Sequence, residues 1–374
     1  MTDEVRRAWA YLSRVAEPPC PQLSALVAQV GPLEAAAKVK AGEVKPGLAR
    51  WVDARRELDC AADDLDILDR LGGRLITPDD VEWPLLSFMA FEGVVRKRSN
   101  GHPPLVLWAI GPARLDEVTG RAAAIVGTRA ATAYGEHVAA ELAAGLAERD
   151  VTVLSGGAYG IDGAAHRAAL ACDGVTVAVV AGGIDNPYPA GHSALFRRIR
   201  EDCLLISEYP PGVPPGRLRF LTRNRLVAAL SGATVVVEAG LRSGAANTAA
   251  WAKDLGRPVC AVPGPVTSAA SAGCHALLRT GANLVSRAAD IVELAGRVGE
   301  LASEEPHPVG PLDGLADGER QIYDALPARG AHTVDEIAVA AGVPPHHVLG
   351  PLAMLEVAGL VISDGGCWRL SRRR

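Results

Sequence analysis

Short runs of Val, Ile, Leu and Ala, each followed by a glycine-rich turn and an amphipathic stretch, dominate the middle of the 374-residue chain. The runs are Leu105–Ile110, Ala122–Val126, Thr152–Leu154, Thr176–Val180, Leu204–Ile206, Thr234–Val237, Val259–Val262 and Asn283–Val285. Because apolar and polar residues do not alternate in them, they predict strands buried on both faces, as in a parallel sheet between helices. The repeated strand, turn and helix predict a doubly wound, Rossmann-like α/β core, whose ligands bind at the carboxyl ends of the strands.

The segments on either side of this core have different patterns. Residues 1–75 carry apolar residues at three- and four-residue spacing, which predicts a small all-α domain before a core over residues 76–300. Residues 301–315 contain three prolines and no periodicity, as expected of a linker. Residues 316–374 contain three helical stretches and a hairpin, which predicts a winged-helix-like domain.

The net charge of the C-terminal segment indicates what kind of partner the winged-helix-like domain binds. Residues 303–374 contain 6 basic and 10 acidic residues, a net charge of −4. The expected recognition segment, Pro344–Gly350, has no Arg or Lys. Since duplex DNA is bound through basic side chains, this composition favours a protein contact over duplex recognition.

Composition removes several classes of protein. The net charge of −5 excludes a protein whose whole surface is strongly basic, but it does not exclude a basic surface confined to one region. The seven cysteines show no C-x-x-C spacing, so we expect free thiols and neither disulfides nor a metal site. The first residues lack the apolar run of a signal peptide, and the uncharged stretch Pro258–Leu278 is broken by prolines. We therefore expect a cytoplasmic protein that does not insert into membranes.

Three expected strand ends carry glycine, hydroxyl or arginine residues. A strand that leads into a helix N-terminus presents free N–H groups, which bind phosphate, and an arginine adds a bidentate partner. Each set taken alone also fits an ordinary surface turn, but together they predict a groove lined for phosphates. The residues are Thr128 and Arg129 in the first set, Ser155, Gly156, Gly157, Tyr159 and Gly160 in the second, and Arg242, Ser243 and Gly244 in the third.

No catalytic constellation accompanies these loops. The second one is neither G-x-G-x-x-G nor a Walker A motif, and no acid follows the second strand to hold a ribose, so a nicotinamide cofactor is not supported. Asp162 and His166 lie four residues apart and share a helix face, which would suit an acid/base pair. A helix cap and a hydrogen-bonded histidine are the more frequent arrangement. We expect no enzyme activity, no cofactor and no metal.

Residues 197–225 are strongly basic, with seven arginines and three acids. Phe220, one of only four phenylalanines, lies between Arg219 and Arg223. Basic side chains neutralise phosphates and an aromatic ring stacks on a base, which is the composition of a single-strand nucleic-acid channel. The alternative is a solvated charged face with Phe220 in the core. The arginines are Arg197, Arg198, Arg200, Arg217, Arg219, Arg223 and Arg225.

Ordered motifs over residues 100–296 resemble the DNA-processing protein A (DprA/Smf) family. They are Ala124–Arg129, Ser155–His166, Leu205–Gly212, Phe220–Arg225, Val237–Gly244, Ala261–Gly264 and Gly273–Leu278. The layout, with a SAM-like helical domain before the core and a winged-helix-like domain after it, is also similar. The resemblance implies a homodimeric protein that binds and protects single-stranded DNA and helps to load the RecA recombinase, in natural transformation or in general recombination.

The family pattern also implies roles for individual residues. Arg129 would grip a phosphate, Gly156 and Gly157 would bring backbone amides to the strand, and Phe220 would stack on a base. Two departures are visible: Tyr159 stands where the family usually has a basic residue, and Phe220 is followed by Leu221 rather than proline. The remaining pocket residues would be Arg217, Arg223, Asn224, Arg225, Arg242, Ser243 and Gly244.

A second hypothesis is an enzyme. Residues 155–165 also resemble the nucleotide-binding glycine loop of the lysine-decarboxylase-like nucleoside-monophosphate phosphoribohydrolases. That class carries a Pro-Gly-Gly-x-Gly-Thr loop and a catalytic glutamate near the position of residues 238–247. The chain lacks the loop signature, and Asn247 and Thr248 supply no acid, so binding is favoured over catalysis.

Overall fold

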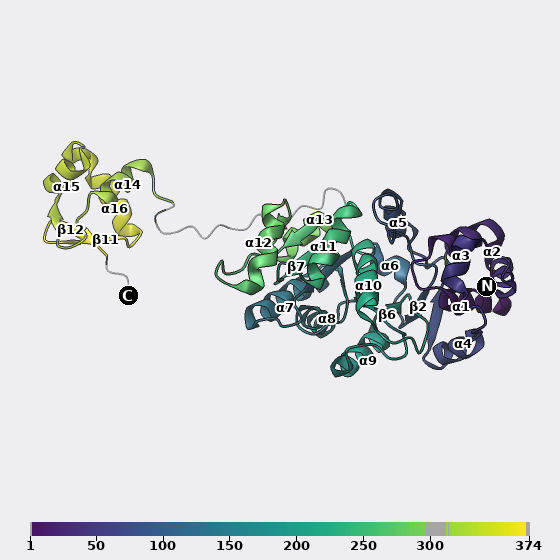
Figure 1. Cartoon of the computed structure of the whole chain (residues 1–374). Helices are drawn as coiled ribbons and strands as arrows, with labels where there is room; N and C mark the ends of the chain where they lie inside the picture. Colours follow the sequence, from purple (N-terminus) through teal and green to yellow (C-terminus); the bar gives the residue numbers. More distant parts are fainter. Residues whose placement is uncertain (1, 297–311, 313, 372–374) are drawn as a thin grey trace. The chain divides into compact units, whose positions relative to one another are not determined.

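The computed structural model describes residues 2–296, 312 and 314–371 (Figure 1). Contacts divide the chain into two compact units, residues 1–302 and residues 303–374, which are described separately. The predicted linker at 301–315 lies almost entirely outside the described residues. Among those that are described, no single helix is long and apolar enough to cross a membrane, although one bent pair, Val334–Ala341 with Pro345–Val357, passes that test by length and composition.

A nine-stranded sheet forms the centre of the first unit within the described residues. Each predicted run overlaps a strand, with bounds that differ by at most two residues, and β1 is a ninth strand that the sequence did not reveal. The strands are β1 (Gly73–Ile76), β2 (Leu107–Ile110), β3 (Ala122–Gly127), β4 (Thr152–Ser155), β5 (Thr176–Val180), β6 (Leu204–Ser207), β7 (Ala233–Val237), β8 (Val259–Ala261) and β9 (Asn283–Leu284).

The order of the strands defines where a ligand can bind. The sheet runs β1-β2-β6-β5-β4-β3-β7-β8-β9, and all neighbours from β6 to β9 are parallel. β1 and β2 are antiparallel additions at one edge. The chain builds outward from β3 in one direction through β6 and then returns to place β7 on the other side of β3. The crevice between the carboxyl ends of β3 and β7 is therefore the topological switch point of a doubly wound sheet.

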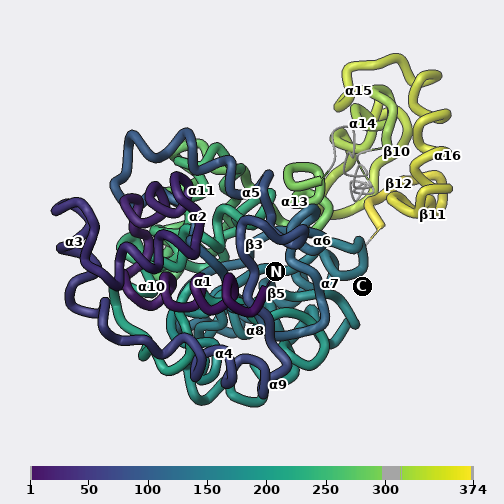
Figure 2. The backbone as a smooth tube through the Cα atoms, turned by 90° about the vertical axis from the view of Figure 1, so that its right-hand side faces the viewer, coloured from purple at the N-terminus to yellow at the C-terminus, as the bar shows by residue number. Residues whose placement is uncertain are grey.

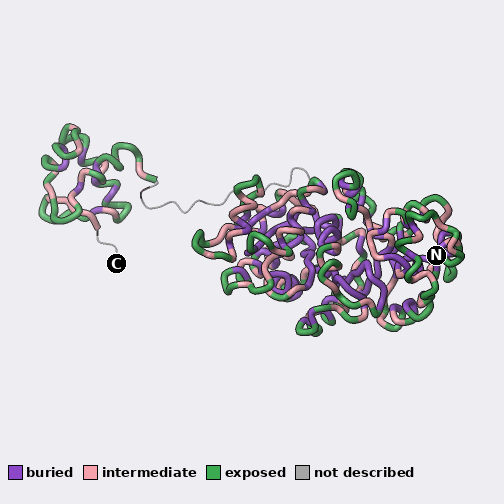
Figure 3. The backbone as a smooth tube through the Cα atoms, viewed as in Figure 1, coloured by how far each residue is buried: buried purple, intermediate pink, exposed green. Residues whose placement is uncertain are grey.

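Helices cover both faces of this sheet (Figures 1 and 2). α7, α8 and α13 pack on one face, where Leu142, Ile161 and Ile291 are fully or almost fully buried. α10 and α11 pack on the other, with Leu226 and Trp251 in the core. Figure 3 shows that the buried residues gather in the interior of the unit. The helices of the core are α5 (Leu85–Met89), α6 (Leu115–Thr119), α7 (Ala133–Ala147), α8 (Ile161–Ala171), α9 (Ser193–Asp202), α10 (Arg217–Ala229), α11 (Gly244–Asp254), α12 (Ala272–Arg279) and α13 (Ala288–Ala295).

The N-terminal segment is helical, as predicted. Its helices are α1 (Asp3–Val15), α2 (Pro21–Ala41), α3 (Pro46–Val52) and α4 (Ala61–Arg70). α2 breaks at Gly31, whose φ of 80° lies outside the helical region, at the Gly-Pro pair in its middle. Trp9 and Leu12 of α1 share one hydrophobic cluster with Trp108 of β2 and Leu205 of β6. The helices therefore pack directly against the antiparallel edge of the sheet.

The second unit is a winged-helix domain. It consists of α14 (Asp317–Asp324), β10 (His332–Thr333), α15 (Val334–Ala341), α16 (Leu349–Val357), β11 (Val361–Asp364) and β12 (Cys367–Leu370), and the small sheet runs β10-β12-β11. Its core contains Ile322, Ile337 and Leu352. The predicted capping box is present, since Thr333 Oγ1 accepts from Glu336 N and Thr333 N donates to the Glu336 carboxylate at 2.8 Å. The predicted fold is thus confirmed: an α/β core with a mostly parallel sheet, N-terminal helices and a C-terminal winged helix.

Candidate functional site

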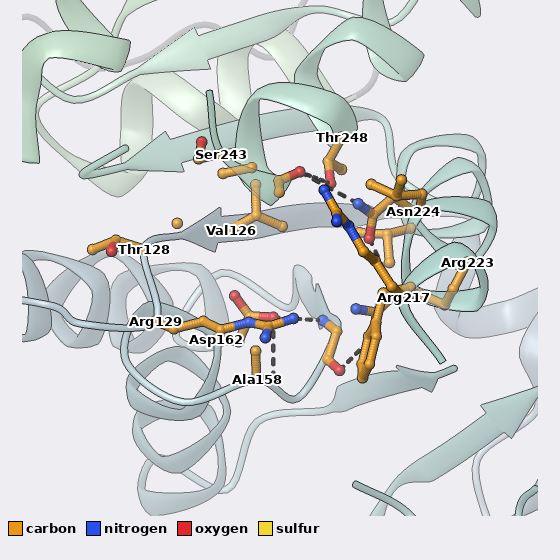
Figure 4. A pocket seen from close by; sticks show the side chains of 17 residues that line it. Val126, Thr128, Arg129, Ala158, Asp162, Arg217, Arg223, Asn224, Ser243 and Thr248 are labelled. Atoms are coloured by element: carbon orange, nitrogen blue, oxygen red, sulfur yellow. Dashed lines mark hydrogen bonds between the residues drawn. The ribbon is translucent and has the colours of Figure 1, made fainter. Parts of the chain in front are cut away.

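A pocket of about 610 Å³ opens at the switch point of the sheet (Figure 4). Its wall comes from the loops after β3, β4 and β7 and from α10. The pocket therefore lies where the topology of the sheet places a ligand site.

Nine of the fifteen predicted site residues line this pocket. They are Thr128, Arg129, Gly156, Arg217, Phe220, Arg223, Asn224, Ser243 and Gly244. Segments as far apart in sequence as β3 and α11 thus meet in one place. The lining also contains residues that the sequence did not single out, among them Val126, Val227 and Ala245. Their apolar side chains carry no signal that separates a pocket wall from the core.

Five other predicted residues lie around this pocket rather than in its lining. Ser155 is fully buried and its hydroxyl donates to the Ile125 carbonyl at 2.6 Å, so it holds β4 against β3. Gly157 and Gly160 shape the loop after β4. Tyr159 and Arg242 are exposed at the surface.

The structure corrects the expected position of Arg225. Its side chain is fully buried, and it donates two hydrogen bonds to the Glu208 carboxylate at 2.8 and 2.5 Å. Glu208 is itself 3% exposed. A direct contact of Arg225 with DNA would require a buried ion pair to open, which is strongly unfavourable. We therefore assign Arg225 to the core of the protein.

The arginine stretch is also not one continuous basic surface. Arg219 forms an ion pair with Glu17 of the N-terminal segment at 2.6 Å, and Arg198 faces Asp202 on α9 at 3.4 Å. Because these carboxylates neutralise two of the seven arginines, the surface of residues 197–225 carries less positive charge than the number of arginines suggests. The cations that reach the pocket are Arg129, Arg217 and Arg223.

Arg223 lies in the floor of the pocket. It is 5% exposed, and it donates to the carbonyls of Gly156, at 2.6 Å, and Val179. Burial lowers the pKa of this guanidinium to about 10, with the nearby Asp162 opposing the shift. Arg223 therefore remains charged at neutral pH, and among the residues that the structure describes no carboxylate forms a direct ion pair with it.

Gly156 is required at its position by this arginine. A Cβ at Gly156 would lie 2.4–2.5 Å from three atoms of the Arg223 guanidinium. The Gly156 amide is also not free for a ligand, because it donates to Asp162 Oδ2 at 3.2 Å, as does the Ala158 amide at 3.3 Å. The glycine loop thus serves to admit Arg223, and its amides at residues 156 and 158 are occupied by Asp162.

Phe220 forms an aromatic wall beside these cations. Its ring is partly exposed. The guanidinium carbon of Arg129 lies 5.1 Å from the ring centroid, and that of Arg223 lies 5.9 Å from it. An aromatic face next to guanidinium groups can take a base while those groups take the adjoining phosphates.

Of the arrangement that the sequence favoured, the hydrogen-bonded histidine is present but the helix cap is not, because α8 has Gly160 at its N-cap position and no side-chain cap hydrogen bond. Asp162 accepts from the two loop amides, and burial raises its pKa. His166 is fully buried, with its Nδ1 2.7 Å from the Thr176 hydroxyl. His166 is not among the residues that line the pocket, and it acts as a structural residue.

His166 should make the protein sensitive to acid. Burial, reinforced by positive charge at His192, Arg223 and Arg167, lowers the pKa of His166 to about 3 in the folded protein. The unfolded state then binds the proton first, so stability is fully present above about pH 6.5 and is lost as pH falls towards 3. At about pH 4.5 we expect a loss of up to about 2–3 kcal/mol of unfolding free energy. Denaturant titrations across pH should show this loss shrink in His166→Asn; an identical pH profile for this variant would exclude His166 as the cause.

The acids near the site are engaged in structure. The Glu238 carboxylate accepts from the Thr132 amide at 2.9 Å and from the Thr132 hydroxyl at 2.5 Å, and it is 4% exposed. It fastens the end of β7 to the start of α7. Among the residues that the structure describes, no group of three or more metal-binding side chains is found.

The fold and the pocket together define a class: a Rossmann-like protein with a cationic, aromatic-walled pocket at the switch point of its sheet. The family is given by sequence. Residues 74–296 match the family model for DNA recombination-mediator protein A, and residues 306–366 match that for the DprA winged helix domain. The chain belongs to this DprA/Smf family.

Individual relatives agree with this assignment. The chain is 70% identical to the DprA-type DNA processing protein of Mycobacterium tuberculosis over 373 residues, which cover 100% of this chain and 96% of the relative. It is 38% identical to protein Smf of Escherichia coli over 253 residues, 67% of this chain and 68% of the relative.

Two solved structures are also similar. DNA processing protein A of Streptococcus pneumoniae superposes with a TM-score of 0.64 at 27% identity, covering 79% of this chain and 99% of that one. DNA processing protein A of Helicobacter pylori, described for its single-stranded DNA binding mode, gives 0.50 at 29% identity and covers 59% and 94%.

Proposed function

We propose that this protein binds single-stranded DNA in the pocket at the switch point of its sheet. The observation that carries the proposal is the placement of the Phe220 ring beside Arg129 and over the buried Arg223. Phosphates would meet the guanidinium groups and an unpaired base would stack on Phe220. The single-strand binding described for the Helicobacter pylori relative supports the same ligand here.

The geometry favours a single strand over a duplex. Stacking on Phe220 requires a base that is free of its Watson–Crick partner, since a duplex already covers both faces of its bases. The pocket is also formed by closely spaced loops that surround a strand end rather than by a broad convex surface. Because stacking and phosphate contacts do not depend on the identity of the base, binding should depend little on base sequence.

We propose further that binding protects the strand and helps to load a RecA-type recombinase, in natural transformation or in general recombination, from a cytoplasmic homodimer. The family name, recombination mediator, supports this role. The winged helix would contact a protein: its exposed residues include the apolar Val339, Met354 and Val357, and the segment is acidic.

We propose that the pocket binds DNA and does not catalyse a reaction. Asp162 and Glu238, the acids nearest the pocket loops, are buried and accept hydrogen bonds from the backbone. A phosphoribohydrolase would require a free carboxylate near the sugar. An assay for base release from nucleoside monophosphates, run beside a single-strand mobility shift, separates the two functions.

Arg129→Ala tests the phosphate contact. The exposed guanidinium lines the pocket, so its loss should weaken binding for every base sequence. The slope of log affinity against log salt should fall by about 0.7 for the one contact removed. Fluorescence anisotropy at several salt concentrations measures this slope, with Arg50→Ala, a surface arginine on α3, as the matched control. A slope unchanged from that of the wild type would remove Arg129 from the DNA path.

A further inference from the structure

Beside Phe220 lies an exposed aromatic residue, Tyr188, that was not among the predicted site residues. Tyr188 is on the loop between β5 and α9 and is 49% exposed. Its ring centroid lies 5.9 Å from that of Phe220, with an interplanar angle of 63°. Within the described residues, its hydroxyl has no hydrogen-bond partner. An exposed ring that supports the proposed stacking residue is itself placed to meet the next base.

The loop that carries Tyr188 is fastened to the loop that leads into α10. Gly183 N donates to the Val213 carbonyl at 2.7 Å, and Gly212 N donates to Asp185 Oδ1 at 2.9 Å. These bonds couple the position of Tyr188 to that of Phe220. The two rings therefore form a preorganised pair, which lowers the entropy lost when a ligand orders them.

Tyr159, on the loop after β4, contacts the β5–α9 loop a few residues beyond Tyr188. The centroid of the Tyr159 ring lies 4.8 Å from that of the His192 ring, in an edge-on arrangement. A Cβ at Gly191 would lie 2.4 Å from the Tyr159 hydroxyl. Tyr159 is 45% exposed. Gly191 is three positions after Tyr188 in the chain, a span of at most about 11 Å. The loop thus carries one exposed ring and supports another.

A cation lies at this end of the loop. Arg167 is exposed on α8. A Cβ built at Gly163 would lie 3.0 Å from Arg167 Nη1 and 2.5 Å from Cε1 of the His192 ring, so the guanidinium lies close to this ring. Aromatic rings interleaved with arginines are the composition of a surface that follows a single strand. The same pattern that marks the pocket therefore continues across the β5–α9 loop.

We propose that Tyr188, with Tyr159 beyond it, forms a second stacking ledge for unpaired nucleobases, so that a DNA strand leaving the pocket continues over the β5–α9 loop. This ledge rests on the proposed single-strand binding function and extends its site. The ligand class is a further unpaired base of the strand whose first base stacks on Phe220. Tyr188 is assigned here as a binding residue and Tyr159 as the next ring along the same path.

The test uses the full-length protein and oligothymidylates of roughly 4 to 16 nucleotides, the range of single-strand site sizes. Tyr188→Ala should weaken binding about 5- to 150-fold for strands long enough to reach the ledge and leave the shortest strand unaffected. The salt slope should not change, because no charge is removed. Tyr188→Phe should bind as the wild type does, since the ring remains. Trp51→Ala, an exposed aromatic residue beside Arg50 on α3, is the matched control.

A second readout locates the base. With 2-aminopurine placed at successive positions, the ledge position should lose its quenching in Tyr188→Ala while the pocket position keeps it. Wild-type binding with no length-dependent loss in Tyr188→Ala would overturn the ledge and leave the pocket standing. Equal losses in Tyr188→Ala and Tyr188→Phe would also overturn it, because a hydroxyl contact and not stacking would then be at work. Absence of binding by the wild type at every length would overturn the single-strand function itself, and the ledge with it.

Discussion

Arg225→Met should destabilise the first unit by about 3–5 kcal/mol, because it leaves the carboxylate of Glu208 buried without its partner. Both side chains are almost wholly inaccessible, at 0% and 3% exposure. The Arg225 guanidinium also lies 5.8 Å from the Phe91 ring in the core. Chemical denaturation of the full chain, followed by tryptophan fluorescence, measures the loss.

Two comparisons make this result specific. Arg198→Ala removes an exposed ion pair with Asp202 and should change stability by less than about 1 kcal/mol. The double variant Arg225→Met with Glu208→Leu should recover most of the loss, since replacing both members of a buried pair by apolar groups is often neutral. DNA affinity per folded molecule should be normal in Arg225→Met. Normal stability with reduced affinity would instead place Arg225 in the DNA site.

Phe220→Ala should reduce single-strand affinity by about 1–3 kcal/mol, or roughly 5- to 150-fold, with little change in salt dependence. The ring is partly exposed and lies beside the guanidinium groups of Arg129 and Arg223, so a base can reach it without disturbing the core. Removal of a partly exposed ring at the pocket wall leaves no closed cavity, and the unfolding free energy should change little. Anisotropy titration and thermal melting of the same preparation measure both quantities.

A buried phenylalanine provides the contrast. Phe88 is 4% exposed and packs against Trp83 at 4.9 Å. Phe88→Ala should cost about 3–5 kcal/mol of stability and leave the affinity of the folded molecules unchanged. If Phe220→Ala behaved like Phe88→Ala in both respects, the stacking role would be wrong and Phe220 would belong to the core.

The sequence predicted the core because the physics of a parallel sheet is local in sequence. Strands buried on both faces must be apolar throughout, so each run was visible without knowledge of its neighbours. β1 was missed because Gly73–Ile76 is short and includes an arginine in a strand at the sheet edge. The antiparallel direction of β2 could not be predicted, since composition does not encode strand direction.

Helix geometry explains why Arg223 lines the pocket, as predicted, and why Arg225 does not. Successive residues of a helix are about 100° apart, so Arg223 and Arg225 of α10 point in nearly opposite directions. Once Arg223 faces the pocket, Arg225 must face the core, a distinction that a count of basic residues ignores. The pairing of Arg219 with Glu17 joins residues 202 positions apart and leaves no local trace. Tyr188 was missed for the same reason, because only the folded chain places it against Phe220.

The central claim, single-strand binding through the pocket, is tested most directly by titrating the protein with single- and double-stranded DNA of equal length across a range of salt concentrations. We expect clearly tighter binding of the single strand than of the duplex. We also expect a slope of log affinity against log salt of about −2, since Arg129, Arg217 and Arg223 would each contribute about 0.7. Duplex binding as tight as that of the single strand, or single-strand binding indifferent to salt, would contradict this claim.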